Sequence, residues 1–102
     1  MTLLNTSFHF AAGLENEFLD WIRDIYFPAS CSAGIFTDIT LARIEGDMHP
    51  GTSAYCFQMK AADAEAARHW HDVTAAPLRG ELQRRYADRL VFFSTFMTVI
   101  EL

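Results

Sequence analysis

The stretch that decides the fold is LVFFSTFMTVIEL, residues 90–102. We interpret it as one long strand, whose alternating residues form two apolar sets: Phe92, Phe96 and Ile100 against Val91, Phe93, Met97 and Val99. A strand that is apolar on both faces has to be covered on both sides. The helices of the chain can cover only one face of its sheet. We therefore expect a second copy of the chain to cover the other.

Three further segments show the two-residue periodicity of strands: residues 3–10, 36–44 and 52–60. Apolar residues recur at helical spacing in two others, residues 14–27 and 63–86. We expect the first helix to end or kink before Pro28, because proline disfavours helical geometry at the preceding residue. The second is expected to break before Pro77. Residues 45–51 contain two glycines and a proline, which predicts a hairpin loop between the second and third strands.

These segments follow one another as strand, helix, strand, strand, helix, strand, which is the order of a ferredoxin-like β-α-β-β-α-β fold. Right-handed crossovers then predict an α+β domain with a four-stranded antiparallel sheet. Strands one and three lie in its centre and both helices lie on one face. The chain has 102 residues, close to the commonest size of one domain, so we expect residues 1–102 to form a single domain.

The composition favours a subunit interface and argues against nucleic acid as a partner. Hydrophobic residues make up 51% of the chain, more than one small core needs, and the surplus predicts a homodimer. The net charge is −5 with no basic block, whereas nucleic-acid binding depends on Lys and Arg neutralising phosphates. Acidic residues alternate with the arginines of the last helical segment, so we interpret these as a solvated face: Arg79, Arg84, Arg85 and Arg89.

No stretch of the sequence reaches the ~20 apolar residues that span a bilayer, and the first five residues lack the basic region of a secretion signal. We therefore expect a cytoplasmic protein with no membrane partner. Cys31 and Cys56 have no CxxC spacing, so free thiols are expected rather than a disulfide. No metal or cofactor is expected. His69 and His71 would diverge by about 200° on a helix, and no phosphate-binding, GxSxG or HExxH motif occurs.

Short segments spread over nearly the whole chain carry a resemblance: LLNTS (residues 3–7), FLDWI (18–22), YFP (26–28), GIF (34–36), YCFQ (55–58), APLR (76–79) and LVFFST (90–95). They resemble a family of small uncharacterised bacterial proteins that carries a domain-of-unknown-function label. The resemblance implies a dimeric α+β barrel, in which two ferredoxin-like sheets face each other across a two-fold axis. It implies no activity. The wider fold group includes cofactor-free monooxygenases, haem-degrading enzymes, muconolactone-isomerase-like proteins and amino-acid-sensing domains, so fold does not name a function.

The candidate ligand-binding residues are polar groups that we expect on the sheet face away from the helices: Asn5, Ser7, His9, Cys56, Gln58 and Ser94. The place of Ser94 depends on the phase of the last strand, which its two apolar faces leave open. Buried polar groups need partners, so this cluster bonds to itself, holds water or receives a ligand. We favour a hydrogen-bonded layer that fixes the register of the dimer over a ligand site.

Three functions stay open, and no catalytic residue can be named. The first is a domain that binds a small apolar or aromatic molecule, or a protein partner, at the dimer barrel. The alternative is an enzyme of the cofactor-free oxygenase or isomerase kind, with His9 as proton-transfer group and with Asn5 and Gln58 orienting the substrate. The third is a regulatory interaction module. The ligand and enzyme hypotheses both require a cavity of a few hundred Å³ that touches His9.

Overall fold

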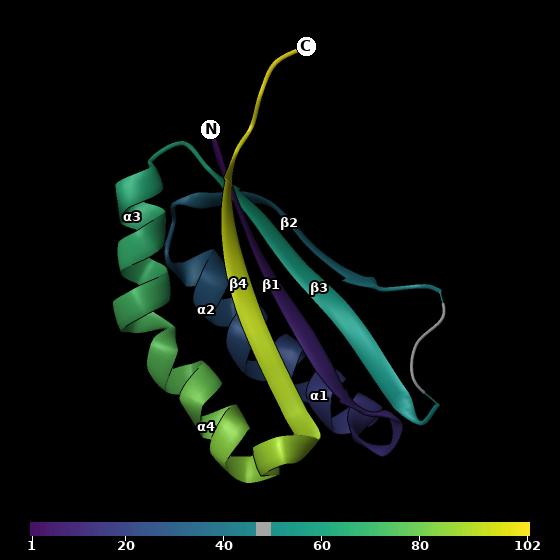
Figure 1. The fold of residues 1–102 in the computed structure, drawn as a ribbon. Helices are drawn as coiled ribbons and strands as arrows, with labels where there is room; N and C mark the ends of the chain where they lie inside the picture. The colour runs from purple at the N-terminus through teal and green to yellow at the C-terminus, as the bar shows by residue number, and fades with distance from the viewer. Residues whose placement is uncertain (47–49) are drawn as a thin grey trace.

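The computed structural model describes residues 1–46 and 50–102 and contains a four-stranded antiparallel sheet with all its helices on one face (Figure 1). The strands are β1 (Thr2–Ala11), β2 (Phe36–Arg43), β3 (Thr52–Ala61) and β4 (Leu90–Thr98). Their order in the sheet is β2-β3-β1-β4, so the prediction that strands one and three are central is confirmed. The predicted hairpin loop includes residues 47–49, which lie outside the described residues.

Two helical passages cover the sheet. The first comprises η1 (Ala12–Leu14), α1 (Glu15–Trp21), η2 (Ile22–Tyr26) and α2 (Phe27–Ser32). The second comprises α3 (Ala64–His69), η3 (Trp70–Thr74), α4 (Ala76–Tyr86) and η4 (Ala87–Arg89). Gly34 follows the first passage with a φ of +70°, a conformation that glycine adopts without steric cost, as expected of a residue that caps a helix.

Each passage contains a π-helical turn that is separated from its proline by one or two residues. The sequence predicts an end or a kink before Pro28. The helix does not end there, since Phe27 keeps helical dihedral angles and its amide donates to the carbonyl of Ile22 in a π turn. The π turn places Pro28 in the first turn of α2, and Pro77 likewise lies in the first turn of α4. A proline costs little there, because the first amides of an α-helix have no intrahelical acceptor.

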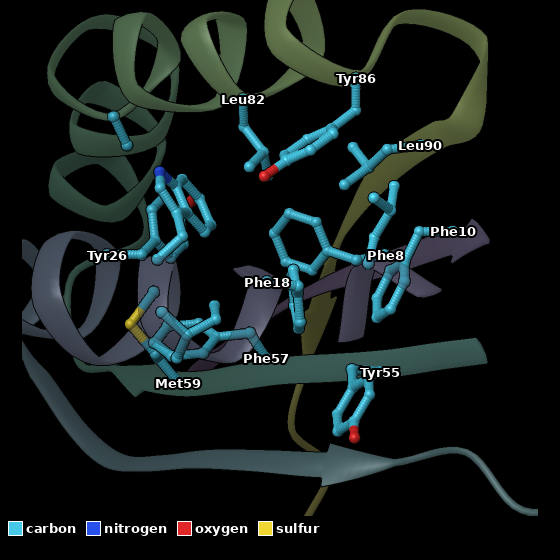
Figure 2. Close-up of a cluster of buried hydrophobic side chains, with 14 of the residues drawn as sticks. Phe8, Phe10, Phe18, Tyr26, Tyr55, Phe57, Met59, Leu82, Tyr86 and Leu90 are labelled. Atoms are coloured by element: carbon cyan, nitrogen blue, oxygen red, sulfur yellow. The ribbon is translucent and has the colours of Figure 1, made fainter. Parts of the chain in front are cut away.

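The core lies between the sheet and the helices and is rich in aromatic rings (Figure 2). Phe8 of β1 is fully buried at its centre. Its ring lies 5.0 Å from that of Phe18 and 6.0 Å from that of Phe92, measured between centroids. Tyr26 and Phe57 pack edge to face at 5.2 Å. Aromatic pairs at such distances add to the stability that burial already supplies.

The last strand is shorter than predicted, and its phase is now determined. β4 ends at Thr98 rather than Leu102, and the residues after it extend away from the sheet (Figure 1). Phe92 pairs with Phe8 in the register with β1, which turns the even-numbered residues of β4 toward the helices. The odd-numbered ones face the opposite side, where no element of the described chain covers them: Val91, Phe93, Thr95 and Met97.

Candidate functional site

The sheet face away from the helices, called the outer face below, brings together five of the six predicted site residues. Asn5 is paired with Gln58, and Ser7 with Cys56, in the register of β1 with β3. Asn5 Nδ2 donates to Ser7 Oγ at 3.2 Å, and Ser7 Oγ lies 3.5 Å from Cys56 Sγ. The fifth residue, His9, follows on the same face of β1. The cluster thus bonds partly to itself.

One polar atom of this cluster is left over. Asn5 Oδ1 is buried yet has no hydrogen-bond partner in the described chain. A buried acceptor without a donor costs roughly 1–3 kcal/mol. This oxygen is covered by the chain itself, so the cost belongs to the packing of the cluster.

The sixth predicted residue, Ser94, does not belong to this cluster. It is paired with Thr6, not with Asn5 or Ser7, and its hydroxyl lies 2.8 Å from Thr6 Oγ1 on the helix side of the sheet. The reason is the two-residue period of a strand: because Phe92 faces the core beside Phe8, Ser94 has to face it too. The prediction that Ser94 joins the outer face is wrong.

A hollow of about 330 Å³ lies beside His9 at the end of the sheet and is open to solvent. It is lined by His9, Phe10, Ala11, Thr52, Asp88, Arg89 and Val91. The imidazole of His9 stacks on the ring of Phe93 with 5.8 Å between the centroids. The hollow has the size that a small ligand needs, but neither Asn5 nor Gln58 lines it.

Sequence reasoning missed a second polar cluster, which lies on the helix side of the sheet. Its members are Asp72, His71, Ser94 and Thr6, and we call it the His71 relay. His71 and Asp72 belong to the π turn η3, and His71 Nδ1 lies 2.7 Å from Asp72 Oδ1. His71 Nε2 lies 2.7 Å from Ser94 Oγ on β4. The sequence holds no signal for this contact, because 23 residues separate its two partners.

Arg79 of α4 supports the relay from the core side. It is only 5% exposed, so the interpretation of this arginine as part of a solvated face is wrong. Its Nη2 donates to the carbonyl of His71 at 2.8 Å, and its Nη1 donates to the hydroxyl of Tyr26 at 3.0 Å. Burial raises the pKa of the Tyr26 phenol, against the opposing effect of Arg79. Arg79 thereby fixes the backbone of the turn that carries the imidazole.

The charges around His71 act on its pKa in opposite directions. Burial lowers the pKa of the imidazole below its ordinary value of 6.5, and the cations Arg79 and Arg68 lower it further. The carboxylate of Asp72 raises it but does not outweigh burial. The hydrogen bond from His71 lowers the pKa of Asp72. At neutral pH the pair is therefore a neutral imidazole beside a carboxylate.

Over residues 1–46 and 50–102, no three His, Cys, Asp or Glu side chains gather where they would hold a metal ion. None of the helices in that part of the chain is long and apolar enough to span a membrane. Both cysteines are free thiols.

Comparison with known proteins decides the family. Residues 1–100 match the family described as "Domain of unknown function (DUF4286)". The chain belongs to this family. This confirms the resemblance seen in the sequence. The description of the family names no activity. No curated protein matches the sequence.

Solved structures with the same fold include proteins described in different terms. A putative antibiotic biosynthesis monooxygenase from Deinococcus radiodurans has a TM-score of 0.70 at 8% identity, with 100% of this chain and 95% of that chain covered. An uncharacterised NIPSNAP domain protein from Burkholderia xenovorans has a TM-score of 0.62 at 17% identity, covering 98% and 95%. A dimeric ferredoxin-like protein from an uncultured marine organism has a TM-score of 0.61 at 7% identity, covering 99% and 98%. At these identities the likeness establishes the ferredoxin-like fold of the DUF4286 chain and nothing further.

Proposed function

We propose that this DUF4286 protein is a homodimer whose two outer faces meet, and that a small aromatic or apolar molecule binds in the hollow beside His9. The observation that carries the proposal is the exposure of the apolar side chains on the outer face of β4. Val91, Phe93 and Met97 are between 38% and 56% exposed. Together they form an apolar row along the edge strand of the sheet, interrupted by Thr95, and exposed apolar patches of this kind mark contact surfaces.

A second copy is the partner that suits this surface best. The apolar row flanks the polar residues Asn5 and Ser7, so the face has the apolar and polar parts that a self-complementary interface requires. One protein of the same fold is described as dimeric, which supports a dimer of this chain.

Sedimentation equilibrium tests the dimer. We expect wild-type protein to sediment as a dimer and Phe93→Asp to sediment as a folded monomer, because a carboxylate at this position would be buried without a partner. Phe27→Asp is the matched control, since Phe27 is also an exposed aromatic residue but lies on α2. It should remain dimeric. A monomeric wild type, or equal dissociation in both variants, would overturn the proposal.

The ligand part of the proposal rests on the composition of the hollow. Phe10, Ala11 and Val91 supply apolar walls, while His9, Asp88 and Arg89 supply polar groups. Such a mixture binds a small ring and orients it through one polar substituent. In the proposed dimer, the neighbouring outer face would be covered by the second copy, which would narrow the opening of the hollow.

Amide chemical shifts in ¹⁵N-labelled protein test this binding with indole and benzoate as probes. We expect shifts at His9, Arg89 and Val91 that saturate with probe concentration. They should be lost in His9→Leu and kept in the control His69→Leu, whose side chain is exposed on α3. Shifts that appear elsewhere, or no shifts at all, would remove the ligand site and leave the dimer untouched.

A proton-transfer activity in the same hollow is the second candidate, favoured by the imidazole of His9 in its wall. A histidine is the side chain best suited to take a proton near neutral pH. Deuterium exchange into the central carbon of acetylacetone should then be faster with wild type than with His9→Gln. Equal exchange with both proteins excludes His9 as the base.

A further inference from the structure

We propose that Ser94 is a nucleophile for acyl transfer, with His71 as its general base and Asp72 as the residue that positions His71. This site lies on the helix side of the sheet and does not depend on the homodimer or on the hollow beside His9. Nothing in the sequence pattern assigns it. It comes from three hydrogen-bonded side chains that the fold brings together from η3 and β4.

The hydrogen bonds of the relay run in one order, from Ser94 through His71 to Asp72. Asp72 accepts from His71 Nδ1 at 2.7 Å, which places the proton of the neutral imidazole on that nitrogen. His71 Nε2 is then an acceptor, and the hydroxyl of Ser94 donates to it at 2.7 Å. A serine that donates to an imidazole held by a carboxylate is the arrangement that activates serine nucleophiles on unrelated folds.

Ser94 and His71 are each held in place by a further contact. Thr6 on the neighbouring strand lies 2.8 Å from Ser94 Oγ. Because Ser94 gives its proton to His71, Thr6 is the donor in this contact. Arg79 holds the carbonyl of His71 from below at 2.8 Å. Groups fixed by a strand and by a buried arginine keep the geometry that proton transfer requires.

The surroundings of His71 favour its neutral form, which a general base requires. The charged groups that face His71 are Asp72 on its own turn, Arg68 on α3 and Arg79 on α4. From β4 it meets Ser94 and the ring of Phe96, which carry no charge. Burial together with the two arginines keeps its pKa below 6.5, so the imidazole is free to accept a proton at neutral pH.

The surroundings also suit an acyl substrate. The guanidinium of Arg68 lies 4.1 Å from the ring centroid of Phe96, and His71 meets the same ring edge to face at 5.3 Å. Arg68 thus places a positive charge over the ring of Phe96, two residues along β4 from Ser94. β4 is an edge strand, Ser94 is partly exposed, and 14% of the His71 side chain is exposed. A small carboxylic ester with an apolar acyl group matches this mixture of ring and cation.

The reaction balances without any further reagent. Ser94 Oγ bonds to the acyl carbon, the bond from that carbon to the leaving alcohol breaks, and the serine proton passes through His71 Nε2 to the leaving oxygen. Water then attacks the acyl carbon and gives a proton to His71. The imidazole returns this proton to Ser94 Oγ as the carboxylic acid leaves.

Covalent labelling with a fluorophosphonate probe tests the proposal, because the probe phosphonylates activated serines. We expect a single adduct, mapped by peptide mass spectrometry to Ser94. We also expect Ser94→Ala and His71→Gln to lower the labelling rate by about 100-fold or more. Ser53→Ala is the control, since Ser53 is a part-buried strand serine outside the relay. It should label like wild type. Hydrolysis of 4-nitrophenyl acetate should follow the same order.

A structural role alone would leave a different pattern. The labelling rate of wild type should rise as His71 loses its proton, at a pH below 6.5. Asp72→Asn should lower the rate near neutral pH and displace this profile, because the asparagine no longer fixes the imidazole proton on Nδ1. A wild type without an adduct, or an adduct at another residue, would overturn the assignment. Both of these outcomes are measured on wild-type protein, so they do not require a variant to fold, and they do not depend on the oligomeric state.

Discussion

The two faces of the sheet are built from the same strands, but the inner face is buried and the outer face is exposed to solvent. Phe92 and Phe93 are neighbours in sequence, yet Phe92 packs against Phe8 in the core while Phe93 is 56% exposed. The inner face is sealed by aromatic rings and by a network around Arg79. The outer face carries apolar residues in contact with solvent. Alternation therefore assigns each residue to a face of the sheet, whereas the elements packed on that face determine whether the residue is buried or exposed.

Replacing one phenylalanine on each face should give the largest contrast. Phe8→Ala is expected to lower the free energy of unfolding by about 3–5 kcal/mol, because it leaves a cavity among fully packed rings. Phe93→Ala should change the free energy of unfolding of the monomer by less than about 0.5 kcal/mol, since it removes an exposed side chain. Urea unfolding at low protein concentration, where dissociation is complete, measures both. Equal losses would mean that the outer face is already buried within one chain.

Two arginines of α4, one buried and one exposed, extend the comparison between buried and exposed positions to polar side chains. Arg79→Met is expected to cost about 2–4 kcal/mol, because it leaves the hydroxyl of Tyr26 and the carbonyl of His71 without their donor. Arg84→Met changes an exposed residue of the same helix and should stay within about 0.5 kcal/mol. Urea unfolding of the two variants decides this. Similar values for both would show that the network around Arg79 adds little to stability.

The arrangement of the sheet was predictable because it follows from local periodicity and general topology. The period of residues 3–10 and 52–60 places Asn5, Ser7, Cys56 and Gln58 on one face, and right-handed crossovers make β1 and β3 neighbours. No long-range side-chain contact is needed for this step. The family resemblance added the fold but no chemistry.

The phase of β4, the burial of Arg79 and the His71 relay depend on long-range contacts that cannot be read from the sequence. The phase of β4 is fixed by Phe92 against Phe8, whereas both sets of its side chains are apolar in sequence. Arg79 looks like a surface arginine in the sequence, and its burial depends on the hydroxyl of Tyr26, 53 residues away, and on the carbonyl of His71. The relay requires the π turn η3 to pack beside β4, which brings His71 to Ser94 across 23 residues of sequence. A proline normally indicates the end of a helix, but in this chain each helical passage continues past its proline after a π turn.

The smallest expected effect concerns pH and tests the electrostatics of the inner face. Because burial holds the pKa of His71 below 6.5 in the folded chain, the unfolded chain binds a proton first as the pH falls. His71 therefore leaves stability unchanged well above pH 6.5 and lowers it progressively as the pH drops from there to the folded-state pKa. His71→Gln should flatten this part of the profile, whereas His69→Gln, which changes an exposed histidine of the neighbouring turn, should leave it as in wild type. Urea unfolding across this pH range measures the slope. A wild type that instead gains stability on acidification would mean that the carboxylate of Asp72 outweighs burial, and the imidazole would then be charged at mildly acidic pH.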